Sequence, residues 1–266
     1  MTIIALGPLD LGIAALLIVA LAATVRWQRL GLEGSLLIAA ARTVIQLLLI
    51  GMVLKSLFAE TRLLWIALLA LAMLLIAGRE VAQRQKRRFL GWWGFGIGTG
   101  AMFTSSFTVT LLALVVIIGP TPWYAPQYAI PLLGMMLGNT MTGIALALER
   151  LTQEAWRERG TIEARLALGH SAQEAMIPMR RDAIRTGLTP IINSMAAAGI
   201  VSLPGMMTGQ ILGGNPPMTA VGYQILIMFM ISAGTGFGTL IAVWIATRRL
   251  FDRRQRLRLD RLNTPQ

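Results

Sequence analysis

Two long stretches without a charged residue, 89–148 and 186–247, dominate the hydrophobic pattern of the chain. Each is about twice the ~20 residues that one helical crossing of a bilayer needs. Each contains one segment rich in helix-breaking residues, GPTPWYAPQ (119–127) and GQILGGNPP (209–217). Together with three earlier apolar runs, this pattern predicts seven membrane-spanning helices: 11–25, 35–54, 63–78, 99–118, 128–148, 188–205 and 221–246.

Composition agrees with an all-α polytopic membrane protein, because 55% of the 266 residues are hydrophobic and the mean hydropathy is +0.66. We expect residues 1–266 to form a single transmembrane domain. No cysteine is present, which excludes disulfides and thiolate metal sites. No basic residue lies in positions 1–9, so the first helix is expected to be a retained span and not a signal peptide.

The basic residues predict an orientation. Connections 26–34, 79–88 and 149–187 and the tail 247–266 hold 21 Lys and Arg, whereas the alternate connections hold only Lys55 and Arg62. Because Lys and Arg accumulate on the cytoplasmic side, the N-terminus is predicted to be outside and the C-terminus inside. The basic tail is best explained by anionic lipid, and no nucleic acid partner is expected.

The segment 149–187 is predicted to be a cytoplasmic loop built as helix, glycine turn, helix. The fifth span continues as LERLTQEAWRERG, with Arg150 and Glu154 at i,i+4 and Gly160 as its stop. Thr161 then caps a short helix that ends at Gly169. Ser171 and Glu174 form a capping box that opens a second helix, in which Pro178 is expected to introduce a kink.

This loop resembles the EAA loop of ABC transporter permeases, the helix that sits in a groove of the ATPase. The resemblance lies in Glu163, Ala164, Arg165 and Gly169, although Arg165 replaces an alanine and the downstream Ile-x-Leu-Pro is missing. It implies an ATPase-coupling role for Glu163, Ala164, Arg165, Gly169, Ser171 and Glu174. The alternative is an amphipathic loop on the membrane surface.

The chain lacks an energy source of its own. A P-loop needs Gly directly before its Lys, but Lys55 and Lys86 follow Leu54 and Gln85. All twelve carboxylates and His170 lie outside the predicted spans, which disfavours a proton-coupled carrier. The chain is therefore expected to be a transport subunit and not an enzyme, with no bound cofactor; ATP and Mg²⁺ would be held by a separate ATPase.

Polar groups within the spans are candidates for a translocation path, with helix packing as the alternative. Arg42 is the one charge inside a span and could instead extend to the interface; Gln46 lies one turn further. In the fifth span, Met135, Asn139 and Thr142 recur at helical spacing and form a polar stripe. The candidates are Arg42, Gln46, Met135, Asn139, Thr142, Asn193, Met206, Met207 and Gln210. The methionines are equally explained as apolar filling, and the metal-contacting residues stay undefined.

Three longer motifs carry a family resemblance: ARTVIQLLLIG (41–51), GMMLGNTMTGIALALERL (134–151) and PGMMTGQILGGNPPMTAVGYQI (204–225). They resemble the FetB-type permeases, membrane subunits of a bacterial iron-export ABC transporter, whose family includes plant proteins linked to aluminium tolerance. The resemblance implies a multi-pass protein of the bacterial inner membrane, a homodimer working with a FetA-type ATPase, and a role in iron homeostasis and oxidative stress. A secondary transporter or channel for a small solute or metal, and a seven-span receptor, are the alternatives.

Overall fold

The computed structural model describes residues 7–59 and 62–263, so the last three residues of the predicted tail, 264–266, lie outside the described residues. The described part is helical apart from three isolated bridges. It groups into two compact units, Met1–Arg62 with Leu212–Asn215, and Leu63–Ile211 with Pro216–Gln266. In the first unit, α1 (Pro8–Trp27) and α2 (Glu33–Ala59) pack against each other. Both are apolar along most of their length, as expected for helices in lipid, although α2 contains Arg42 and Gln46.

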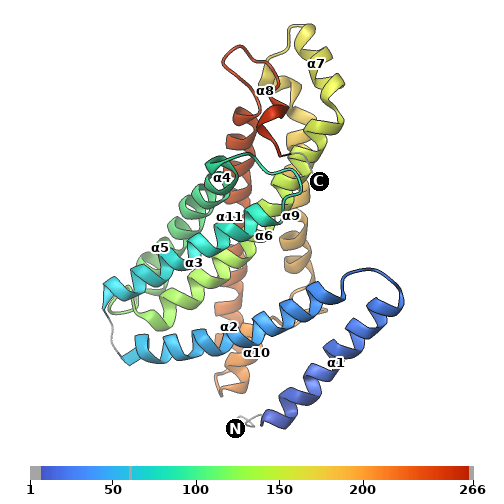
Figure 1. The fold of residues 1–266 in the computed structure, drawn as a ribbon. Helices are drawn as coiled ribbons and strands as arrows, with labels where there is room; N and C mark the ends of the chain where they lie inside the picture. The colour runs from blue at the N-terminus through green and yellow to red at the C-terminus, as the bar shows by residue number, and fades with distance from the viewer. Residues whose placement is uncertain (1–6, 60–61, 264–266) are drawn as a thin grey trace. The chain divides into compact units, whose positions relative to one another are not determined.

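The second unit is a bundle whose helices alternate in direction (Figure 1). α6 and α11 run parallel, because Gly234 lies against Met136 while Gly238, one turn on, lies against Ile144. α9 runs antiparallel to both and returns the chain to the opposite end. The helices are α3 (Leu63–Gln83), α4 (Trp92–Met102), α5 (Thr108–Leu112), α6 (Pro126–Arg157), α9 (Ile177–Ala197), α10 (Gly205–Leu212) and α11 (Pro217–Arg249).

α4 and α5 belong to one continuous rod. Two π-helical turns, Phe103–Phe107 and Ala113–Ile118, precede and follow α5. π-Helical turns of this kind concentrate at functional sites and widen the helix locally. The rod ends at Gly119, whose left-handed backbone (φ 61°) favours a residue without Cβ.

Six helical segments in the described residues are long and apolar enough to cross a membrane: α1, α2, α3, the rod Trp92–Ile118, α6 and α11. The bounds predicted for the sixth span, 188–205, are wrong. α9 begins earlier, at Ile177, and ends at Ala197, where Gly199 (φ 81°) turns the chain. Its uncharged part, 186–197, extends only ~18 Å at 1.5 Å per residue. The count of seven spans is therefore not confirmed.

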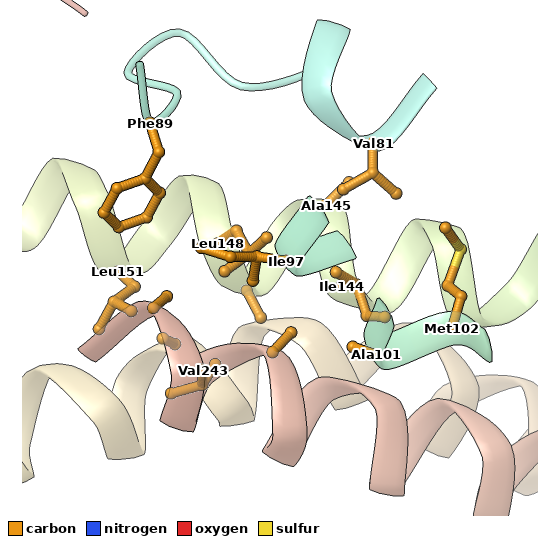
Figure 2. Close-up of a cluster of buried hydrophobic side chains, with 14 of the residues drawn as sticks. Val81, Phe89, Ile97, Ala101, Met102, Ile144, Ala145, Leu148, Leu151 and Val243 are labelled. Atoms are coloured by element: carbon orange, nitrogen blue, oxygen red, sulfur yellow. The ribbon is translucent and has the colours of Figure 1, made fainter. Parts of the chain in front are cut away.

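The core of the second unit joins α3, α4, α6 and α11. Figure 2 shows Val81, Ile97, Met102, Ile144 and Val243, all of them buried, with side chains directed toward one another. α9 closes against α6 at Gly187, where an added Cβ would lie 2.6 Å from the carbonyl oxygen of Gly143. Only glycine permits this separation of the two backbones.

The basic connections of the second unit gather at one end. The backbone N–H of Lys86 donates to Glu149 Oε2 at 2.7 Å, and the N–H of Asn263 donates to the carbonyl of Arg88 at 2.8 Å. Segments 79–88, 149–187 and the tail thus lie at the same end, as the charge pattern requires of segments on one side of a membrane. Which side this is stays a prediction.

Candidate functional site

The loop between α6 and α9 contains two short helices, α7 (Arg159–Ala167) and α8 (Ala172–Ala175), joined by a glycine turn. The predicted helix, turn, helix order is confirmed, but the predicted stop at Gly160 is wrong. α6 ends at Arg157 and the break falls at Glu158 (φ −97°, ψ 22°), so Gly160 lies inside α7. Thr161 does not cap a helix either; its hydroxyl donates to the Glu158 carboxylate at 3.1 Å.

Gly169 ends α7 as predicted. Its φ is +91°, its N–H donates to the Leu166 carbonyl at 3.0 Å, and the next N–H, of His170, donates to the Arg165 carbonyl at 3.1 Å. This is the Schellman arrangement, which satisfies the last carbonyls of a helix and needs a left-handed residue. The position of the glycine therefore fixes where α7 turns into α8.

Ser171 and Glu174 form the predicted capping box. The Glu174 N–H donates to Ser171 Oγ at 3.3 Å, while the Ser171 N–H and hydroxyl each donate to Glu174 Oε2 at 2.8 Å. These bonds, first of all the one from the Ser171 backbone, lower the pKa of Glu174. The helix that opens here is one turn long, and Pro178 does not kink it. Pro178 instead starts α9, where its missing N–H costs nothing.

The α7–α8 turn is fixed to the bundle by apolar side chains. Ile162, Ala175 and Met176 are fully buried and belong to the main core. The Arg165 guanidinium donates to the Ala175 carbonyl at 3.4 Å, which ties the end of α7 to α8. Glu163 and Ala164, on the other side of α7, are exposed. A partner protein would therefore meet a rigid helix with a free outer face.

Ion pairs connect the C-terminal part of α6 with the N-terminal part of α9, next to this turn. Arg150 pairs with Glu154 at 3.3 Å, as the sequence spacing predicts, and also with Asp182 of α9. Glu154 lies within 3.7 Å of Arg157 as well. Arg150 therefore links the C-terminal part of α6 to the N-terminal part of α9.

The C-terminal tail is a feature that the sequence did not reveal. Its contact with anionic lipid stays a prediction, and the structure adds a contact with the loop: the Ala172 N–H donates to Gln255 Oε1 at 2.7 Å. A groove of about 840 Å³ lies between the α7–α8 turn and tail residues 253–257. Glu163, Gly169 and Glu174 line its first wall. Arginines are common in both lipid anchors and folded tails, so composition could not separate the two.

The path candidates of the second unit lie on α6, α9 and α10. Met135, Asn139 and Thr142 share one face of α6, and Asn139 is exposed there, its amide donating to the Met135 carbonyl at 2.9 Å. Met206 packs with Met135 on the same apolar cluster. Asn193 is exposed on α9, whereas Met207 and Gln210 are half-buried on α10. Arg42 and Gln46 are exposed on α2 of the first unit. The path role of these residues stays a prediction.

A buried cluster of hydroxyls lies deeper in the bundle and was missed by the sequence reading. The Ser106 hydroxyl donates to Thr140 Oγ1 at 3.2 Å. Thr235 and Thr239, one turn apart on α11, are buried, and their hydroxyls have no hydrogen-bond partner among residues 7–59 and 62–263. The i,i+4 spacing of these threonines was the available signal. The described chain contains no group of three or more His, Asp or Glu that could hold a metal ion.

Residues 8–251 match the family described as "Uncharacterised protein family (UPF0014)". This chain belongs to the UPF0014 family. It is 39% identical over 252 residues to a UPF0014 membrane protein of Synechocystis, which covers 93% of this chain and 95% of that protein. The FetB resemblance is confirmed: identity to the Escherichia coli "Probable iron export permease protein FetB" is 31% over 253 residues, 95% of each chain.

The plant resemblance is confirmed as well. The Arabidopsis thaliana "Protein ALUMINUM SENSITIVE 3" is 31% identical over 245 residues, which span 92% of this chain and 88% of the plant protein. No solved structure matches this chain. Together with six apolar helices, the family identifies a multi-pass membrane protein of permease type.

Proposed function

We propose that this chain is the permease subunit of an ABC transporter that exports iron or a related metal ion from the cytoplasm, driven by a separate ATPase subunit. The observation that carries the proposal is the α7–α8 turn, a capped helix with an exposed outer face and a buried inner face. Such a helix offers a rigid surface to a motor protein. The name of the E. coli relative supports the metal.

The contacts that follow the turn connect it mechanically to α9 and, through α9, to α6 and α11. Met176 caps the start of α9 and is fully buried, so α8 and α9 move as one piece. α9 in turn contacts α6 and α11 at Gly187, next to Thr239 and Gly143. Small side chains at a helix crossing leave a smooth contact, along which α9 can shift relative to its neighbours.

The proposal places the basic end of the second unit in the cytoplasm and a second copy of the chain against the exposed polar face of α6 and α9. Asn139 of α6 and Asn193 of α9 are both exposed, and exposed amides are costly in lipid. A bare cation loses its hydration shell at a large cost unless charged ligands replace it, and the described residues contain no group of three or more His, Asp or Glu that could do so. We therefore expect iron to cross with part of its ligand shell.

The test is transport in proteoliposomes that contain the permease with its ATPase. We expect ATP to drive ferrous iron away from the side of the vesicle membrane that holds the ATPase. This transport should be absent when either subunit is omitted. Gly169→Val should lower ATP-driven transport while both subunits remain bound to the membrane. Transport by the permease alone down an iron gradient would instead identify a channel or secondary carrier.

A further inference from the structure

The tail that follows α11 forms a small hairpin. Leu250, Phe251 and Leu262 are buried, and Phe251 bridges to Leu257 across the hairpin. The Arg258 N–H donates to the Leu250 carbonyl at 2.8 Å, which closes the hairpin. A segment with this many internal contacts holds a defined surface and is not a loose anchor.

The tip of the hairpin is organised by one carboxylate. Asp252 accepts the backbone N–H groups of Arg256 at 2.9 Å and Arg254 at 2.8 Å, and pairs with the Arg256 guanidinium at 3.2 Å. These bonds, led by the Arg256 N–H, lower the pKa of Asp252. The tip is held against α8 by Gln255 through its bond to the Ala172 N–H.

Two arginines of this tip keep their charge available. Arg253 and Arg254 are exposed, and neither side chain forms an ion pair within the described part of the chain. Both line the groove that separates the tip from the α7–α8 turn. The carboxylates of Glu174 and Asp252 are already satisfied by their own loops. Glu163 also lines the groove and is exposed, so Arg253 and Arg254 are set against one carboxylate and leave an excess of positive charge beside the α7–α8 turn.

We propose that this groove receives an acidic segment of the ATPase subunit, so that Arg253, Arg254 and the α7–α8 turn form one docking surface. This inference rests on the proposed function. Charge complementarity defines the occupant, because arginine binds carboxylates with paired hydrogen bonds. α7, α8 and the C-terminal tail lie together at one end of the second unit (Figure 1), and residues of all three line the groove; this position favours a protein over a lipid surface. α6 alone extends ~13.5 Å past Leu148, the end of the uncharged stretch 89–148.

The experiment measures binding of the purified ATPase subunit to the detergent-purified permease. The test variant is Arg253→Glu with Arg254→Glu. The matched control is Arg84→Glu with Arg88→Glu, two exposed arginines at the same end that do not line the groove. We expect the test variant to weaken binding at least about tenfold, the equivalent of about 1.4 kcal/mol. The control should stay within about threefold.

Several outcomes separate the possibilities. Unchanged affinity of the test variant would overturn the docking surface while leaving the proposed function intact. Failure of the unmodified chain to bind any ATPase would overturn the proposed function itself. Loss of binding to phosphatidylglycerol vesicles, with ATPase affinity unchanged, would assign the arginines to lipid and overturn the inference. If the glutamate variant does not fold, the Arg253→Gln, Arg254→Gln variant serves, with a smaller but measurable loss expected.

Discussion

Replacing Gly169 by valine should loosen the α7–α8 turn through the backbone alone. Gly169 has φ +91°, and no atom lies within 4 Å of the position its Cβ would take, so no side-chain clash arises. A β-branched residue rarely adopts a left-handed conformation. The penalty for a residue with Cβ is about 1–2 kcal/mol, which must be met by opening the turn.

Gly160→Val is the matched control. Gly160 also has no atom within 4 Å of its Cβ position, but it lies inside α7 with an ordinary helical backbone. There valine is favoured over glycine by a few tenths of a kcal/mol. The same added side chain is therefore expected to loosen the loop at one position and to leave it intact nine residues earlier. Gly169→Asn should lie between them, because asparagine tolerates the left-handed region.

Hydrogen exchange of the loop amides measures the effect. The N–H groups of Gly169 and His170 donate to the carbonyls that end α7, so they exchange when the turn opens. A penalty of 1–2 kcal/mol raises the open population about 5–30-fold. Equal exchange in the Gly169→Val and Gly160→Val proteins would refute the reasoning, because the cost would then not come from the left-handed backbone.

Three further predictions concern packing, acid and salt. Gly187→Ala should destabilise the bundle by about 1–3 kcal/mol in thermal unfolding, because the new Cβ meets the α6 backbone at 2.6 Å; Gly236→Ala, with its nearest neighbour at 4.0 Å, should not. The pKa of Glu174 is lower in the folded than in the unfolded protein, so its ionised carboxylate stabilises the fold above pH ~4.5. This stabilisation is lost as pH falls through the folded pKa, and below that pH the unmodified protein and Glu174→Gln should have the same free energy of unfolding. Asp182→Asn removes a half-exposed partner of Arg150 and should cost about 0.5–1 kcal/mol in dilute buffer and less in 0.5 M salt; an effect unchanged by salt would contradict the ion-pair explanation.

The sequence predicted features that depend on a few neighbouring residues. Gly169, Ser171 and Glu174 lie where a helix must end and another begin, and each acts through bonds within five residues. The apolar runs of α1, α2 and α11 likewise follow from the requirement that a lipid-facing helix be predominantly apolar. Local rules of this kind are readable without knowledge of the fold.

Other features depend on contacts that the sequence does not display. The lack of charge in 186–205 predicted one span, but Ala198 leaves the helix and Gly199 turns the chain, while the helix begins among charges at Ile177. The tail was read from its charge alone, yet its arginines flank the buried Leu250 and Leu262. Helix bounds and the fold of the tail are both decided by packing against distant segments, which the sequence does not display.

The arrangement of charge along the bundle links the two proposals. Ionisable groups of the second unit gather at the end that holds the α7–α8 turn, whereas the middle of α6, α9 and α11 carries only amides, hydroxyls and apolar groups. In the proposed transporter, a neutral interior would not draw a metal across by fixed charge, so movement would come from displacement of helices. We expect that displacement to reach the interior through α9. It begins at the buried Met176 beside the turn, passes α6 at Gly187, and carries Asn193 near its other end. A partner that binds both the α7–α8 turn and the tail arginines is attached to α9 through the turn and to α11 through the tail, which continues directly from α11. Such a partner would move α9 against α11 rather than tilt the whole bundle. Two points of attachment on neighbouring helices are what a shear between them requires.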